Sequence, residues 1–352
     1  MKIDGIMQTA PARAASSATD LEHSGYDAAW TAEMDHDPFL PLVAASQVTS
    51  RIELGTSIAV AFARNPMTMA NVGWDLQAYT QGRFVLGLGS QIKAHIERRY
   101  SMPWGQPAAR MEEMIQAIRA IWDSWLGNSD LEFQGEFYRH TLMPPSSAPD
   151  PADLAGLPLP RIFLAAVGPL MTRTAARSAD GLIFHVFHTM EYLESAVLPG
   201  VRSAREAAGL PTGPFEVAGP VFVASGETDE AMTRAVAGVK ERIGFYASTL
   251  AYRPVLEAHG WEEVQARLNG LAKSHQWDRL ADLVTEDMLH AFAVVARPED
   301  VADEVVRRYD DKVDRVSFSA PYDSEPQMWS GIVQDVGRRT APGPAVAAGV
   351  TR

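Results

Sequence analysis

The sequence predicts an α/β protein, a (β/α)8 TIM-like barrel with a helical insertion before the last strand. Its 352 residues suit one such barrel with additions. Short apolar runs alternate with helical patterns along the chain, which favours parallel strands joined by right-handed crossovers. With eight such runs, closure into a barrel is the economical arrangement. A doubly wound open sheet is the alternative, although residues 87–92 lack the third glycine of a dinucleotide-binding fingerprint.

The expected strands are the short apolar runs of the sequence. In chain order they occupy residues 3–7, 28–32, 52–60, 84–89, 161–166, 181–187, 215–224 and 315–320. The fourth run, Phe-Val-Leu-Gly-Leu-Gly, is almost wholly apolar, which is typical of a strand buried on both faces of a parallel sheet.

Helical patterns fill the intervals between these strands. Asn65 and Pro66 fit an N-cap and a first helical position, and apolar residues follow at spacings of three and four. The clearest helix carries a stripe from Met111 to Trp125 and is ended by Gly127. Further helices are expected at 12–23, 39–48, 169–179, 190–208 and 298–309, with a hairpin at 131–140 and an irregular loop at 143–160.

The domain organisation follows from these elements. Residues 228–290 read as mostly helical with no convincing strand, so they form the expected insertion. Residues 1–336 then make one barrel domain. The tail at 337–352 is rich in small residues and is expected to be mobile.

Composition excludes several classes of function. The chain carries 44 acidic against 31 basic side chains, and such a surface repels the phosphates of nucleic acids. It has no cysteine, so disulfides, thiolate nucleophiles and cysteine metal sites are excluded. Neither a secretory signal nor a long apolar run is found, which predicts a cytoplasmic protein with no membrane partner.

In a barrel, chemistry belongs at the carboxyl ends of the strands, and the second strand is followed by an unusual stretch. His36 lies between Asp35 and Asp37 in residues 33–39. A histidine there could act as a general acid or base near neutral pH. The alternative is a helix-capping turn that leaves His36 exposed.

The fifth strand ends in small residues that run directly into a helix. Ala165, Ala166, Val167, Gly168 and Pro169 would expose backbone N–H groups, and with the helix dipole these could bind a phosphate. An ordinary strand-to-helix turn is the equally acceptable alternative.

The remaining strand ends carry weaker signals. Gly89 would let a ligand approach the backbone, while Ser90 and Gln91 offer hydrogen bonds. His185 and His188 follow the sixth strand but lack a third ligand nearby, so we expect a polar cap over the barrel mouth and no metal site.

Several of these stretches, in this order, resemble the bacterial luciferase-like superfamily, and most of all its branch that uses the deazaflavin coenzyme F420. The matching pieces are residues 25–27, 33–39, 54–58, 65–66, 82–89, 165–169 and 179–183. Each motif is weak alone, but the ordered combination is fairly specific. The likeness covers most of residues 1–225 and returns at 297–322.

The resemblance implies a site for a flavin or deazaflavin at the barrel mouth. It implies a non-prolyl cis peptide between Ser57 and Ile58, behind the ring, with Glu33 also at the cofactor and His36 as the active-site histidine. The stretch 165–169 matches the phosphate-binding backbone, and residues 89–91 match the loop beside the ring.

The resemblance also implies an activity, an oxidoreductase that moves a hydride between F420 and an unidentified organic substrate. An FMN-dependent monooxygenase and a non-catalytic flavin-binding relative remain alternatives. The sequence departs from some dehydrogenases of this branch, because no acid follows the strand-four glycines until Glu97; a sugar-phosphate substrate is therefore in doubt.

The sequence gives only a few indications of the substrate and of a partner chain. Arg64, Lys93, Arg98 and Arg173 are candidates to bind an anionic cofactor tail. The aromatic residues Phe62, Trp104 and Phe187 could line an apolar cleft for a hydrophobic small molecule. Family members often form homodimers, but no surface patch for one can be read here.

Overall fold

A closed barrel of parallel strands forms the centre of the molecule. The computed structural model describes residues 1–210 and 213–341. The barrel strands are β1 (Lys2–Ile6), β2 (Ala28–Thr31), β3 (Glu53–Thr56), β5 (Phe84–Gly89), β8 (Arg161–Ala166), β9 (Gly181–Phe184), β10 (Glu216–Ala224) and β12 (Arg315–Ser319). Their order is β10-β12-β1-β2-β3-β5-β8-β9, and β9 pairs with β10 to close the ring. The barrel prediction is confirmed, and the open-sheet alternative is wrong because no edge remains between β9 and β10.

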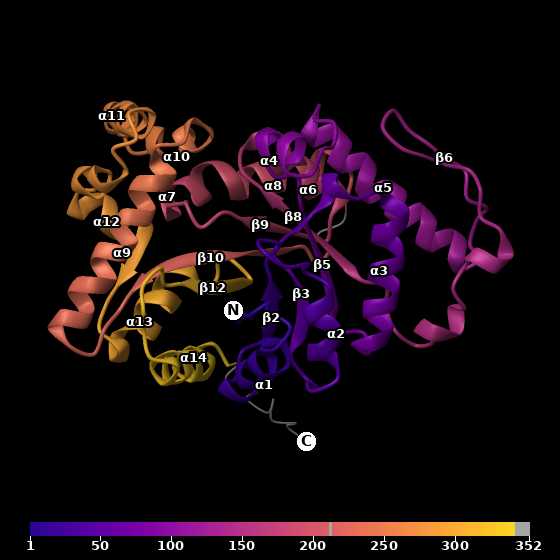
Figure 1. The fold of residues 1–352 in the computed structure, drawn as a ribbon, viewed down its shortest axis with the longest axis horizontal. Helices are drawn as coiled ribbons and strands as arrows, with labels where there is room; N and C mark the ends of the chain where they lie inside the picture. The colour runs from indigo at the N-terminus through magenta and orange to yellow at the C-terminus, as the bar shows by residue number, and fades with distance from the viewer. Residues whose placement is uncertain (211–212, 342–352) are drawn as a thin grey trace, which may run out of the picture.

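Helices surround this barrel (Figure 1). They are α1 (Ala14–Ser24), α2 (Leu40–Ser46), α3 (Pro66–Tyr79), α4 (Lys93–Arg98), α5 (Pro107–Trp125), α6 (Pro169–Ser178), α7 (Met190–Tyr192), α8 (Leu198–Ala207), α13 (Pro298–Tyr309) and α14 (Pro326–Thr340). Within the described residues, no helix combines the length and the apolar character that a bilayer crossing requires.

Local sequence signals explain where the best-defined helices lie. Asn65 caps α3 by accepting a hydrogen bond from the Thr68 N–H at 3.0 Å, and Pro66 is the first helical residue. The predicted stripe of α5 is buried over its whole length against α3 and α6. Both helices therefore form as predicted, and they fix the outer wall beside β5 and β8.

Two of the expected strands are interrupted well inside their predicted bounds. The run at 52–60 divides into β3 and β4 (Ala59–Val60), because a cis peptide joins Ser57 to Ile58 between them. The run at 181–187 ends at Phe184, and the chain then bends at Val186 and Phe187. Both interruptions lie at carboxyl ends of strands, where the backbone leaves the barrel.

The insertion is helical, as expected. It consists of α9 (Asp229–Ala247), α10 (Arg253–Glu257), α11 (Glu262–Lys273) and α12 (Glu286–Phe292), and Figure 1 shows it standing to one side of the barrel. Strand β11 (Ala293–Val295) follows it and extends the sheet beside β10. The sequence analysis missed β11 because three residues give too short a pattern to recognise.

Smaller elements complete the chain. The predicted hairpin is present as β6 (Phe133–Gln134) and β7 (Arg139–His140), and the loop after it contains short 3-10 turns at Pro145–Ser147 and Pro151–Leu154. Further 3-10 turns lie at Ala61–Ala63, Leu250–Tyr252, Trp277–Arg279 and Ala281–Leu283, and a π-helical turn lies at Leu193–Val197. Of the predicted tail, residues 337–340 belong to α14, and 342–352 lie outside the described residues.

The barrel interior is filled, so a ligand must sit above it. Trp30 and Phe163 lie ring to ring at 6.2 Å in an inner apolar layer that also contains Val85 and Ile183. Gly55 makes room for this packing, since a Cβ there would lie 2.3 Å from the Trp30 ring. The interior is therefore a packed core, as in other barrels of this architecture.

Charged side chains close the opposite, amino-terminal end of the barrel. Arg315 is fully buried and holds Asp4 through two hydrogen bonds of 2.8 and 2.9 Å. It also pairs with Glu53 and Glu216, each of which pairs with Arg161. Buried charges of opposite sign that satisfy one another in this way are tolerated in a core.

Candidate active site at the barrel mouth

Glu33 ties together the segments around the cis peptide. Its Oε2 accepts hydrogen bonds from the Val60 N–H at 2.7 Å and from Arg64 Nη1 at 2.6 Å. Its Oε1 accepts one from the Tyr100 hydroxyl at 3.1 Å. The carboxylate is buried and engaged on both oxygens, which fixes the shape of the wall where a cofactor is predicted.

The stretch that carries His36 is held by its acidic neighbours. Asp37 accepts hydrogen bonds from the N–H groups of Phe39 and Leu40 at 2.8 and 3.2 Å, as the capping-turn interpretation expects. It also pairs with Arg64 at 3.0 Å. His36 itself is exposed, with Nε2 3.7 Å from Asp35 Oδ2, so its imidazole is accessible at the mouth. The structure thus combines a capping turn with an available histidine.

Ile58 and the loop after β5 meet behind the proposed ring site. Only glycine fits at position 89, because a Cβ would lie 2.7 Å from Ile58 Cδ1. Ser90 Oγ donates to the Gln91 carbonyl at 3.2 Å, and Gln91 has a positive φ of 59°. The structure therefore brings together the predicted residues from two strand ends, Ser57–Ile58 and Gly89–Gln91.

The loop after β8 leads into α6 with its backbone open. Gly168 is the N-cap, with a φ of 110°, and no side chain caps the helix. Nothing lies within 4 Å of the position that a Gly168 Cβ would take. Ala166 is buried, whereas Val167 and Pro169 are exposed. An uncapped helix start with an open backbone fits a phosphate group chemically, because the first N–H groups lack acceptors.

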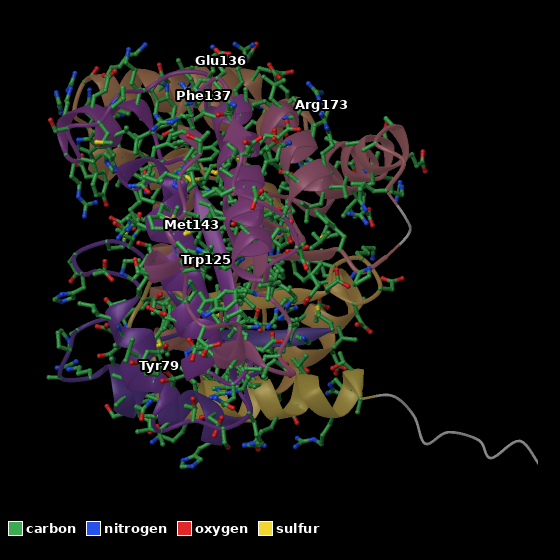
Figure 2. The ribbon with its side chains drawn as sticks, turned by 90° about the vertical axis from the view of Figure 1, so that its right-hand side faces the viewer. Tyr79, Trp125, Glu136, Phe137, Met143 and Arg173 are labelled. Carbon is green, nitrogen blue, oxygen red and sulfur yellow. The ribbon has the colours of Figure 1, made fainter. Side chains whose placement is uncertain are left out.

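A groove of about 680 Å³ adjoins this helix start and is lined by Gln106, Gly168, Leu170, Arg173 and others. Figure 2 shows Arg173 near the same end of the molecule as Glu136 and Phe137, far from Tyr79. Of the predicted cations, Arg64 is taken up by Glu33 and Lys93 lies 3.8 Å from Glu97. Arg98 is exposed on α4 and does not line this groove, whereas Arg173 does, so Arg173 is the predicted cation that lies beside the start of α6.

The two histidines after β9 do not face a common ligand. Burial lowers the pKa of each to about 4, so both imidazoles are neutral at pH 7. His188 Nδ1 lies 3.0 Å from the His185 carbonyl, and its Nε2 lies 3.4 Å from the Tyr309 hydroxyl. His185 instead stacks on Tyr252 and meets the edge of Tyr246. Among the described residues, no group of three histidine or carboxylate ligands is arranged to hold a metal.

The expected apolar cleft is not formed as predicted. Phe62 and Trp104 pack edge to face at 5.8 Å, and Arg110 lies over Phe62 at 4.3 Å. Phe187 belongs to a different cluster and stacks on Phe292 of the insertion at 4.4 Å. Sequence reasoning missed Tyr246 and Tyr252, because nothing in a helical pattern indicates which aromatic residue will reach a strand end far away in the chain.

Comparison with known proteins places the chain in a family. Residues 3–315 match the family described as luciferase-like monooxygenase. The chain belongs to the luciferase-like family. An uncharacterized protein of Mycobacterium tuberculosis is 47% identical over 316 residues, covering 90% of this chain and 92% of that protein.

More distant relatives of this luciferase-like protein include proteins described as F420-dependent. A putative coenzyme F420-dependent oxidoreductase of M. tuberculosis is 26% identical, covering 81% of this chain and 84% of that protein. The solved F420-dependent tetrahydromethanopterin reductase of Methanopyrus kandleri superposes with a TM-score of 0.77 at 20% identity, covering 96% and 98% of the two chains. That similarity shows a shared fold, which agrees with the closed barrel described above.

Proposed function

We propose that this luciferase-like protein is an F420-dependent oxidoreductase that transfers a hydride between the coenzyme and an organic substrate. The observation that carries the proposal is the layout of the strand ends, where Ile58 packs against the bare backbone of Gly89 on one side and Gly168 leaves the start of α6 open on the other. The F420-dependent relatives support the choice of coenzyme. When bound, the deazaflavin supplies the hydride chemistry.

The chain's own residues would bind and orient the reactants. The N–H groups after Gly168, with Arg173 beside them, would hold the coenzyme phosphate. Ile58, Ser90 and Gln91 would lie along the ring. His36 is exposed at the mouth and would give or take the proton that accompanies hydride transfer.

A titration with F420 and FMN, each separately, tests the proposal through quenching of tryptophan fluorescence. We expect saturable quenching by F420 at lower concentration than by FMN. The opposite order would favour an FMN-dependent monooxygenase, the activity in the family's description. If neither F420 nor FMN binds, both the F420-dependent oxidoreductase and the FMN-dependent monooxygenase are contradicted.

Loss of turnover in His36→Ala separates a catalyst from a protein that only binds a flavin. We expect the variant to bind F420 as tightly as the wild type while coenzyme turnover with a substrate falls about 100-fold or more. Unchanged turnover in His36→Ala would contradict a proton-transfer role. Asp35→Asn serves as the control, since it alters an exposed neighbour without removing the imidazole.

A further inference from the structure

A histidine and a tyrosine meet on the wall of the mouth that the insertion provides. His185 follows β9, and Tyr252 belongs to the 3-10 turn at Leu250–Tyr252 of the insertion. The Tyr252 hydroxyl lies 3.2 Å from His185 Nε2, and the two rings stack at 4.7 Å with 19° between their planes. The insertion therefore places a hydroxyl group on the end of a barrel strand.

The hydrogen bonds assign the proton on His185. Its Nδ1 accepts a hydrogen bond from the Phe187 N–H at 3.1 Å, and burial keeps the imidazole neutral by lowering its pKa to about 4. A neutral imidazole that accepts at Nδ1 carries its proton on Nε2. His185 Nε2–H is therefore the donor in the pair, and the Tyr252 oxygen is the acceptor.

With this assignment, the hydroxyl proton of Tyr252 has no hydrogen-bond acceptor among the described residues. Burial raises the pKa of Tyr252 to about 12, so the proton is retained at neutral pH. Among the described residues, His185 is the only hydrogen-bond partner of this hydroxyl, and it already donates. A hydroxyl that accepts a hydrogen bond becomes a better donor itself.

Strand alternation, continued one residue past the end of β9 at Phe184, directs the pair toward the inside of the mouth. Side chains alternate along a strand, and Ile183 of β9 belongs to the inner layer with Val85 and Phe163. His185 is two residues further on, so it points inward one level higher. In the pairing of β9 with β8, Ala166 lies opposite Phe184, which puts His185 beside the chain leading to Gly168.

The surroundings of the pair are aromatic. Tyr246 meets the edge of the His185 ring at 4.8 Å, and Phe187 lies 5.5 Å from the Tyr252 ring. A ligand group bound against this wall would meet ring faces and one hydrogen-bond donor, which suits an uncharged oxygen and disfavours a phosphate or carboxylate.

We propose that Tyr252 is a specificity-determining residue that donates a hydrogen bond to an uncharged carbonyl or hydroxyl oxygen of the substrate, and that His185 positions it. This inference rests on the proposed function for the reaction, but the binding wall can be tested without coenzyme. The insertion, which carries Tyr252, would then take part in substrate selection. It also agrees with the lack of an acid before Glu97, which puts a sugar-phosphate substrate in doubt.

The experiment measures binding of cyclohexanone, a bare uncharged carbonyl compound, by ligand-observed NMR with and without F420. We expect the wild type to bind it, and Tyr252→Phe to weaken binding about five- to tenfold through the loss of one hydrogen bond. Tyr246→Phe is the matched control, because it removes a hydroxyl from a neighbouring ring that makes only an edge contact with His185. We expect less than a twofold change in that variant.

A double-mutant cycle tests the positioning role of His185. We expect His185→Phe to weaken cyclohexanone binding to the same extent as Tyr252→Phe, and the double variant to be no weaker than either. A purely structural pair would instead lower the unfolding midpoint in Tyr252→Phe and leave binding unchanged after correction for the unfolded fraction. That result, additive losses, or an equal loss in Tyr246→Phe would overturn the proposal.

Glucose 6-phosphate serves as the charged comparison. If it binds more tightly than cyclohexanone and its binding depends on Tyr252, the inference of an uncharged substrate is wrong. Failure of the wild type to bind cyclohexanone with or without F420 also overturns it. If F420 does not bind, the proposed coenzyme is wrong. Comparison of cyclohexanone binding by the wild type and Tyr252→Phe, both without coenzyme, still tests the role of Tyr252.

Discussion

At the scale of single residues, the mouth depends on groups that are buried and fully engaged. Glu33 illustrates this, because its two oxygens join residues from separate segments, Val60, Arg64 and Tyr100. The sequence analysis assigned Glu33 to the cofactor through the resemblance alone. The structure adds a physical role, since this carboxylate keeps Arg64 neutralised and shapes the wall that Ile58 belongs to.

Replacing Glu33 by Ala should therefore destabilise the protein by about 2–3 kcal/mol, because its charge-assisted hydrogen bonds are lost and the partly buried Arg64 keeps only the exposed Asp37 as a carboxylate partner. Denaturant unfolding, read as a change in midpoint at constant slope, measures this. Asp35→Ala, at an exposed acid on the same stretch, should change stability by less than about 0.5 kcal/mol. Equal effects of the two substitutions would contradict the role of Glu33.

At the scale of elements, strand ends were harder to foresee than strands. The strand Phe84–Gly89 and the buried stripe of α5 can be predicted from the pattern of apolar residues over a short stretch of sequence. The breaks at Ser57–Ile58 and at His185 are not periodic features. The first came from family resemblance, and the contact of His185 with Tyr252 spans 67 residues, so only the folded chain reveals it.

The start of α6 offers a test at this scale. Gly168 has φ 110° and ψ 166°, a conformation that is almost restricted to glycine. Gly168→Ala should cost about 1–3 kcal/mol of stability and weaken F420 binding about tenfold, because the N–H groups of the helix start would be displaced. Chemical unfolding and fluorescence titration measure the two effects.

Gly127→Ala is the matched control for Gly168→Ala. Gly127 also has a positive φ, 74°, with nothing within 4 Å of a Cβ, but it follows the far end of α5. It should lower stability without changing coenzyme affinity. Equal losses of F420 affinity in the two variants would show that the Gly168 effect arises from general destabilisation.

At the scale of the whole molecule, the two ends of the barrel are treated differently. The carboxyl end holds the candidate site, whereas Arg315 closes the amino end with carboxylates from β1, β3 and β10. Burial alone would lower the pKa of Arg315, but Asp4, Glu53 and Glu216 outweigh it and raise that pKa. Burial raises the pKa of Asp4, yet its paired hydrogen bonds to Arg315 require the ionised carboxylate, so we treat this pair as charged at neutral pH.

This closure should make stability depend on pH in a defined direction. Burial acts to raise the pKa of Glu53, but the charges of Arg315, Arg161 and Lys2 outweigh it, so the pKa is lower in the folded chain than its ordinary value of 4.5. A carboxyl with a depressed folded pKa contributes stability above its unfolded pKa and loses it as pH falls through the folded value.

Glu53→Gln should therefore be less stable than the wild type by roughly 2 kcal/mol at pH 7, and this gap in the free energy of unfolding should shrink below about pH 4.5. Urea unfolding of both proteins across this range measures the gap, with Glu132→Gln at an exposed position as control. A gap that stays constant from pH 7 to the acid limit would mean that Glu53 stabilises the barrel by packing alone.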